Sequence, residues 1–116
     1  MNLKYIFKIL DKNEWNNAKK KGNYSGSAQD LKDGYIHFSE EEQIHETLKK
    51  HYCKQENLIL LKVHTLNLEH LVWENASNGD MYPHLYSSLD IDNVEDEFEL
   101  ILNKDGTHKL PNTFEK

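Results

Sequence analysis

The sequence is poor in residues that mark several large classes of protein: it has one cysteine, two prolines and five glycines. The single cysteine, Cys53, excludes an intrachain disulfide and a cysteine-based zinc site, and it is typical of a reducing compartment. The glycines form neither a phosphate-binding loop nor the Gly-x-Ser-x-Gly motif of hydrolases. No apolar run approaches the ~20 residues that a membrane helix requires, and residues 1–10 lack the pattern of a signal peptide. We therefore expect a small soluble protein of the cytoplasm.

Positive charge is also scarce. The chain carries 20 acidic residues against 14 basic ones, a formal net charge of −6. Its one basic cluster, Lys19–Lys21, is expected on the solvated face of a helix. A net negative charge disfavours nucleic acid and anionic membranes, so we expect neither as a partner. The acidic run at residues 90–99 lacks the central glycine of a calcium loop and predicts a solvated loop and strand edge.

The residues that are present suit a compact fold. The 116 residues, 37% hydrophobic and 10% aromatic, predict one domain over residues 1–116, with a flexible tail at 111–116. Apolar patterns predict strands at residues 4–10, 35–38, 58–63, 72–74 and 98–102. Helical patterns predict helices at residues 11–22 and 39–52. Because strands and helices alternate without a regular strand–helix–strand rhythm, we expect an α+β fold.

Local signals define the ends of the two helices. Asp11 is placed to cap the first helix, and Gly22 is placed to end it in a left-handed conformation. Ser39 and Glu42 form the capping box predicted for the second helix.

The remaining segments predict irregular structure. Residues 23–33 are rich in turn formers, and we expect a loop that packs through Tyr24 and Leu31. Residues 65–71 predict a helical turn, and residues 75–80 predict a loop.

Residues 30–39 place a histidine on a short aromatic strand. In a strand, Tyr35 and His37 share one face while Ile36 and Phe38 share the other. If Ile36 and Phe38 enter the core, His37 faces a groove. The residues alone leave two alternatives open for His37: a pocket residue or a hydrogen-bonded core histidine.

Residues 81–86 concentrate aromatic rings with polar tips. Tyr82, His84 and Tyr86 lie there in a segment without periodicity, and such segments often line binding sites. Glu74 precedes them as a further candidate, although it is equally suited to the surface. These residues and His37 together form the best candidate for a site.

The seven histidines do not form a recognisable metal site. His45 opens a segment close to the zinc-binding His-Glu-x-x-His motif, but Lys49 stands where the second histidine is needed. His64 and His70 are six residues apart, which is no recognised ligand spacing, and surface positions explain both. We therefore expect no bound metal.

A set of motifs spans almost the whole chain. The motifs are residues 23–39, Trp73-Glu74 and residues 81–86, accompanied by Trp15, Asp105-Gly106 and Leu110-Pro111. In these motifs the chain strongly resembles the bacterial "domain of unknown function 952" family, which has no established activity. Members of that family are similar in fold to ADP-ribosyltransferases. The resemblance therefore implies a split mixed or antiparallel sheet with two main helices and a central cleft for NAD.

The resemblance to ADP-ribosyltransferases also implies roles for residues of this chain. His37 would bind a ribose hydroxyl, Tyr82 or Tyr86 would stack on a ring, and Glu74 or His84 would polarise the attacked ribose or its acceptor. The implied catalytic residues are His37, His84 and Glu74. The implied ligand-binding residues are Ser39, Tyr86, Tyr82, Ser27, Asp30 and Asp33, of which the two aspartates are equally suited to capping turn amides.

Three hypotheses about function follow. The first is an ADP-ribosyltransferase-like enzyme that takes NAD or a related nucleotide as substrate and requires no other cofactor. The second is a non-catalytic module that binds a small polar ligand in the same cleft. The third is an accessory protein recognised through its acidic face. No feature of the sequence indicates an oligomeric state.

Overall fold

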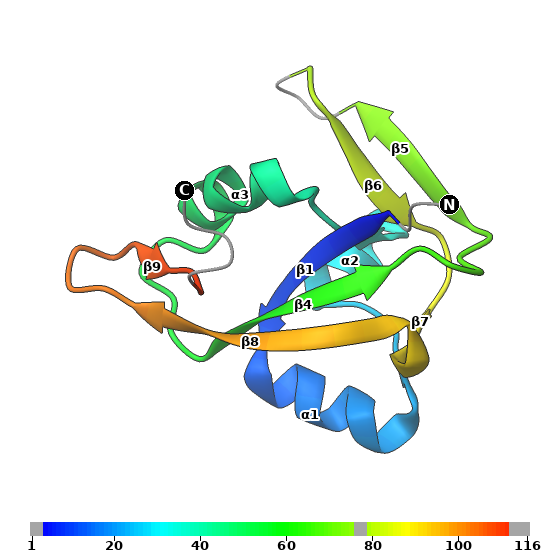
Figure 1. Ribbon diagram of the computed structural model, residues 1–116, viewed down its shortest axis with the longest axis horizontal. Helices are drawn as coiled ribbons and strands as arrows, with labels where there is room; N and C mark the ends of the chain where they lie inside the picture. Colours follow the sequence, from blue (N-terminus) through cyan, green and yellow to red (C-terminus); the bar gives the residue numbers. More distant parts are fainter. Residues whose placement is uncertain (1–3, 76–78, 112–116) are drawn as a thin grey trace.

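The computed structural model describes residues 4–75 and 79–111, and Figure 1 shows how their helices and strands are arranged. The largest sheet has the strand order β1-β4-β8-β9. Its members are β1 (Tyr5–Asp11), β4 (Leu58–His64), β8 (Val94–Leu102) and β9 (His108–Lys109). A second sheet, of order β3-β6-β5, contains β3 (Ile36–His37), β6 (Met81–Leu85) and β5 (Leu71–Asn75). A third, small sheet pairs β2 (Asn23–Tyr24) with β7 (Leu89–Asp90).

Three α-helices lie within the described ranges: α1 (Lys12–Lys21), α2 (Ala28–Asp33) and α3 (Ile44–His51). Short 3-10 helices, η1 (Glu41–Gln43) and η2 (Ile91–Asn93), precede α3 and β8. The strand pairs of the described residues are all antiparallel. The predicted α+β class is therefore confirmed, with a third helix that the sequence analysis did not predict. No helix in the described part of the chain is long and apolar enough to cross a membrane.

The two longer helices cover opposite faces of the large sheet (Figure 1). Alternate residues of β1 point to opposite sides, so Ile6 and Leu10 pack in one cluster and Phe7 and Ile9 in another. The first cluster includes Trp15 of α1, and the second includes residues of α3. Both faces of β4 are buried as well, which confirms the interpretation of its continuous apolar run.

The two larger sheets meet at one bridge. Phe7 and Ser39 exchange both main-chain hydrogen bonds, each 2.8 Å between nitrogen and oxygen. On the amino-terminal side of Ser39, β3 leaves β1 and pairs with β6 instead. The sheets therefore diverge from the Phe7–Ser39 bridge, and the β5–β6 hairpin projects away from the large sheet (Figure 1).

The first helix follows its sequence signals closely. Asp11 Oδ1 accepts hydrogen bonds from the main-chain N–H of Asn13 and Glu14, and Gly22 ends α1 with φ of 92°. The predicted loop at residues 23–33 is wrong, because it contains β2 and the six-residue helix α2. Tyr24 is buried as expected, but the Leu31 side chain is 67% exposed because it lies on the outer face of that helix.

The start of the second helix also differs from its prediction. Ser39 does not cap it, because the Ser39 main chain is held in the bridge to Phe7. Glu40 and Gln43 form the capping box one residue later, and the chain passes through η1 before α3 begins. A strand pairing thus displaces the helix start, although the local sequence favours Ser39.

The segment around Pro83 is a regular strand, contrary to its lack of periodicity. Pro83 lies in β6 between two other strands, where a missing N–H is usually costly. Its carbonyl accepts a hydrogen bond from Phe38 N–H at 3.0 Å, just where β3 ends. The N–H that proline lacks would therefore lie at the end of the β3–β6 pairing. Its absence leaves the β5–β6 pairing intact.

The other boundaries shift by a few residues. β8 begins at Val94 rather than residue 98, and residues 65–70 contain turns instead of a helical turn before β5 starts at Leu71. The turn at Asp105-Gly106 is confirmed by the Gly106 N–H bond to Asn103 C=O. The predicted flexibility of the tail concerns residues 112–116, which lie outside the described residues.

Candidate functional site

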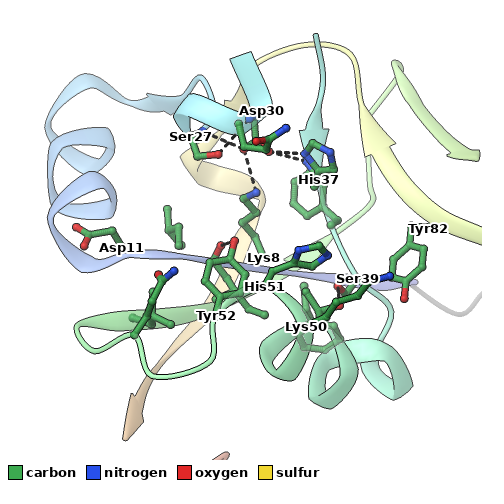
Figure 2. Close-up of a pocket in the computed structure, with 18 of the residues that line it drawn as sticks. Lys8, Asp11, Ser27, Asp30, His37, Ser39, Lys50, His51, Tyr52 and Tyr82 are labelled. Atoms are coloured by element: carbon green, nitrogen blue, oxygen red, sulfur yellow. Dashed lines mark hydrogen bonds and ion pairs between the residues drawn. The ribbon is translucent and has the colours of Figure 1, made fainter. Parts of the chain in front are cut away.

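A pocket of ≈ 770 Å³ opens where β1 and β3 separate beyond the Phe7–Ser39 bridge (Figure 2). It is walled by β1, the start of α2, the end of β3, the outer part of α3 and two residues of β6. The predicted site residues that line it are Ser27, Asp30, Asp33, His37, Ser39, Tyr82 and His84. Glu74 and Tyr86 do not line it. Glu74 contacts the lining residue His84, and Tyr86 contacts Glu74.

Asp30 accepts hydrogen bonds from three different segments that line this pocket. Its Oδ2 accepts from Lys8 Nζ and from the Ser27 N–H, both at 2.9 Å, while Oδ1 accepts from the His37 N–H at 3.2 Å. Asp30 and Lys8 are 2% and 3% exposed, so this is a buried ion pair. Burial alone would raise the pKa of Asp30, but the hydrogen bond from His37 and the charge of Lys8 outweigh it and hold that pKa well below its usual range. Burial lowers the pKa of Lys8, with Asp30 opposing that shift.

The local sequence explains how Asp30 is placed. Ser27 and Asp30 form a reciprocal capping box, which starts α2 and directs the carboxylate inward. Gly26 has φ of +115°, and a Cβ there would come within 2.8 Å of the Asp30 Cβ. A glycine is thus needed beside the buried carboxylate. The Ser-x-x-Asp signal was present in the sequence, but six residues gave no helical periodicity to support it.

His37 lies between two carboxylates. Its Nδ1 is 2.6 Å from Asp30 Oδ1, and its Nε2 is 3.1 Å from Asp33 Oδ2. A carboxylate only accepts, so both contacts are hydrogen bonds at once only when each ring nitrogen carries a proton. The ring is 35% exposed and lines the pocket, which favours the pocket residue over the core histidine among the two predicted alternatives.

His84 is oriented by Glu74 from behind the pocket. His84 Nδ1 is 2.9 Å from Glu74 Oε1, and the Tyr86 hydroxyl donates to the same oxygen at 2.6 Å. The bond from Tyr86, followed by that from His84, lowers the pKa of Glu74. The same hydrogen bond raises the pKa of Tyr86 to about 12. Glu74 therefore contacts His84 from outside the pocket lining.

The two histidines share one end of the pocket. They face each other across the β3–β6 pairing, with ring centroids 5.4 Å apart. Tyr35 stacks on His84 at 4.1 Å and approaches His37 at 4.7 Å. Burial, followed by the charges of Asp33 and Glu74, raises the pKa of Tyr35. Tyr35 and His37 lie on the same face, as predicted, and His84 of β6 lies beside them on that face.

Ser39 contributes mainly through its main chain. Its hydroxyl lies 3.0 Å from the Thr47 hydroxyl of α3, and the residue is 4% exposed. The hydroxyl is thus engaged with α3 at the pocket wall. Ser39 connects β1, β3 and α3 at the point where the pocket begins.

Several pocket residues were not predicted as site residues. They are Lys8, Lys50, His51 and Tyr52, which Figure 2 shows around the cavity. Burial lowers the pKa of His51, with contributions from the charges of Lys50 and His37. Burial also raises the pKa of Tyr52 to about 12. Lys8 carried the clearest sequence signal, because a lysine inside the apolar run of a buried strand requires a counter-charge; the others became visible only through the fold.

The chemistry that these groups offer is proton transfer and hydrogen bonding. Each imidazole is held at Nδ1 by a carboxylate, which leaves Nε2 of His84 available, whereas Nε2 of His37 contacts Asp33. Among the described residues, no group of three or more histidine, cysteine, aspartate or glutamate side chains is placed to hold a metal ion.

Together these features define the class: a small α+β protein with a histidine-lined pocket where two antiparallel sheets diverge. Residues 9–97 match the family described as "Protein of unknown function (DUF952)", and the chain belongs to that family. The predicted family resemblance is thereby confirmed, while the family itself has no stated function.

Solved structures of one bacterial protein are similar over nearly the full chain. The crystal structure of protein CC0527 from Caulobacter crescentus has a TM-score of 0.89 and 43% identity, covering 95% of this chain and 97% of that chain. Its solution NMR structure has a TM-score of 0.82 and 44% identity, covering 97% of each chain. No curated protein matches the chain.

Proposed function

We propose that the pocket binds NAD or a related nucleotide and that the protein is an ADP-ribosyltransferase-like enzyme. The observation that carries this proposal is the meeting of His37 and His84 in a pocket of ≈ 770 Å³. Pockets of about 300–1,000 Å³ are usual for small molecules and cofactors. The lining combines imidazole, hydroxyl and aromatic groups, which suit the ribose and the rings of a nucleotide.

The binding groups are arranged around His37. Asp30 holds Nδ1, while Nε2 contacts the half-buried Asp33, whose carboxylate a ribose hydroxyl can displace. Tyr82 lines the pocket and is the tyrosine that would stack on a ring, since Tyr86 lies outside the lining. The chain contains no arginine. Lys50 and the neighbouring His51 are the groups that would face a phosphate.

His84 is the proposed general base. Its Nδ1 is held by Glu74, which leaves Nε2 to take a proton. In the proposed transfer, the bond between the nicotinamide nitrogen and ribose C1′ breaks, and its electron pair leaves with nicotinamide. The nucleophilic atom of the acceptor bonds to C1′, and its proton passes to His84. Glu74 supports this step by positioning the imidazole.

An ADP-ribosyltransferase-like fold, which the sequence resemblance implies, is part of the same proposal. In those enzymes a split sheet surrounds the NAD cleft, and the sheets of this chain diverge beside the pocket. Fold alone does not assign a reaction, so the proposal depends on the site.

A non-catalytic binding module is the second candidate. It is favoured by the position of Glu74, whose side chain is 40% exposed and lies outside the pocket lining. A site without a carboxylate at the attacked ribose can bind a nucleotide without transferring it. Turnover separates the two candidates, because both bind the same ligand.

A calorimetric titration with NAD, ADP-ribose and AMP tests the proposal. We expect saturable binding that His37→Ala weakens at least tenfold. His45→Ala is the control and should leave binding unchanged, because His45 is exposed on α3 and lies outside the pocket lining. Thermal denaturation of each variant controls for folding. No heat of binding at millimolar ligand would overturn the nucleotide site.

The catalytic part has its own test. We expect the protein to release nicotinamide from NAD, and His84→Ala to abolish this release while NAD still binds. Binding of NAD without any release of nicotinamide, in the presence of a range of protein and nucleic-acid acceptors, would favour the binding module instead.

A further inference from the structure

The main chains of β1 and β3, which line the pocket, lack one hydrogen-bonded residue pair, here called the missing rung. In antiparallel pairs, hydrogen-bonded pairs recur at every second residue. Phe7 and Ser39 form such a pair, with two bonds of 2.8 Å. The next pair in the same register would join Ile9 to His37. The chain does not form it, because β3 has already turned toward β6.

The direction of the main-chain groups follows from their neighbours. Phe38 N–H donates to Pro83 C=O of β6, so the flanking His37 and Ser39 direct their main-chain groups to the opposite side, toward β1. Phe7 likewise faces Ser39, so Ile9, two residues along β1, faces the same side. Lys8 and Leu10 face β4, where they pair with Leu61 and Ile59.

The missing rung comprises four main-chain groups, the N–H and C=O of Ile9 and of His37. Two of them form hydrogen bonds with side chains. The His37 N–H donates to Asp30 Oδ1 at 3.2 Å. The Ile9 C=O accepts from the Tyr52 hydroxyl at 3.3 Å. The remaining two groups are the Ile9 N–H, a donor, and the His37 C=O, an acceptor. The register directs both groups away from β4 and β6, and in the described residues neither is found in a main-chain hydrogen bond outside the strand pairings. Both residues line the pocket.

We propose that these two groups bind a planar ligand group that carries an acceptor and a donor side by side, a primary carboxamide or the N1/N6 edge of adenine. The ligand oxygen or ring nitrogen accepts from the Ile9 N–H, and its amino group donates to the His37 C=O. The proposal rests on the proposed function, because NAD carries both kinds of group, and it goes further by naming what the main chain recognises.

Physical chemistry favours this kind of ligand for two reasons. Main-chain polar groups away from water are nearly always paired in folded proteins, so a ligand that pairs both gains selectivity over one that pairs neither. A primary amide offers one acceptor and one donor, whereas a carboxylate only accepts and would leave the His37 C=O without a donor. A neutral amide therefore fits these two groups better than a carboxylate.

Amide hydrogen exchange measured by NMR tests the proposal directly. In the free protein, the Ile9 amide should exchange much faster than the amides of Lys8 and Leu10, which are its internal controls within one strand. Saturation with NAD should slow exchange at Ile9 at least tenfold and leave Lys8 and Leu10 unchanged. An Ile9 amide that is as protected as Leu10 in the free protein would overturn the inference.

Matched small probes identify the ligand group. Nicotinamide should perturb the Ile9 amide, and 3-acetylpyridine, which keeps the carbonyl but lacks the N–H donor, should bind about tenfold more weakly. Adenosine and purine riboside, which lacks the exocyclic amine, form the equivalent pair. Either pair responding in this way supports the inference and shows which end of NAD is bound.

The failures of the two proposals are distinguishable. If NAD binds but the Ile9 amide keeps its shift and its exchange rate, the main-chain site is wrong and the nucleotide pocket stands. If NAD perturbs no amide of the pocket at millimolar concentration, both proposals are overturned.

Discussion

His37 and His84 are direct partners across the β3–β6 pairing, and their rings meet edge to face with centroids 5.4 Å apart. Each ring is held at Nδ1 by a carboxylate from a different element, Asp30 of α2 for His37 and Glu74 of β5 for His84. Such a bond fixes the orientation of the imidazole. The two rings are therefore presented together at one end of the pocket.

The buried pair of Asp30 and Lys8 should be essential for stability. Asp30→Asn leaves the Lys8 ammonium buried without a counter-charge, and we expect the free energy of unfolding to fall by about 3 kcal/mol or more. Chemical denaturation measures this change. Asp33→Asn is the control, because Asp33 is 31% exposed and its pairing with His37 is worth only about 0–1 kcal/mol. Equal losses in the two variants would contradict the role of Asp30.

Stability should fall in acid because of Asp30. Its folded pKa is held below the ordinary value by His37 and Lys8, which outweigh burial. A carboxyl group with a depressed folded pKa adds stability above its unfolded pKa of about 3.9, and that stability is lost as pH falls toward the folded value. Denaturation midpoints measured below pH 4 should therefore decline steeply in the wild type. The decline should be shallower in Asp30→Asn, and parallel curves would contradict this assignment.

Gly26 should tolerate no side chain. Gly26→Ala places a methyl group within 2.8 Å of the Asp30 Cβ at a φ of +115°, so strain and a clash combine to cost roughly 3 kcal/mol. Gly34→Ala is the matched control, since φ there is +88° but no atom beyond the adjacent residues of the chain lies within 4 Å of the added methyl group. It should cost only about 1–2 kcal/mol. Thermal melts of both variants compare them, and a Gly26→Ala protein as stable as Gly34→Ala would exclude the clash.

Glu74 should act through His84 and Tyr86. Glu74→Gln replaces the carboxylate whose hydrogen bond, followed by burial and the Glu74 charge, raises the pKa of Tyr86 to about 12, so the titration of that tyrosine should move toward its ordinary value of about 10. Turnover of NAD should fall about tenfold to a hundredfold, the loss typical of carboxylates that orient metal-bound imidazoles. Tyr86→Phe keeps the Glu74–His84 bond and should retain most of the activity. Ultraviolet pH titration and the nicotinamide assay provide the two measurements.

The parts of the fold that the sequence predicted are those with long apolar patterns or strong caps. The apolar runs of β1 and β4 indicated buried strands, and Asp11 with Gly22 marked both ends of α1. Shorter elements escaped, because six residues of α2 contain too few apolar positions to show a helical period. Ser39 misled for another reason: its tertiary pairing with Phe7 overrides its local preference for a helix cap.

Seven of the nine predicted site residues line one pocket, but the contacts among them were not predictable from the sequence. The alternation of Tyr35 and His37 against Ile36 and Phe38 correctly indicated a polar face, and His84 was selected by its aromatic surroundings. The bond from Lys8 to Asp30 joins residues 22 positions apart, which no local pattern encodes. The pairing of His37 with His84 depends on the β3–β6 register, and a shift of one residue would have turned the rings apart.

The most direct test is a titration with ADP-ribose followed through the imidazole signals in nitrogen-15 NMR spectra. We predict that the signals of His37 and His84 move together, with one saturation curve, while those of the exposed His45 and of His108, which is engaged with the Gln55 carbonyl, stay in place. Signals of His37 and His84 that do not respond at saturating ADP-ribose would contradict a nucleotide site at this pair of histidines.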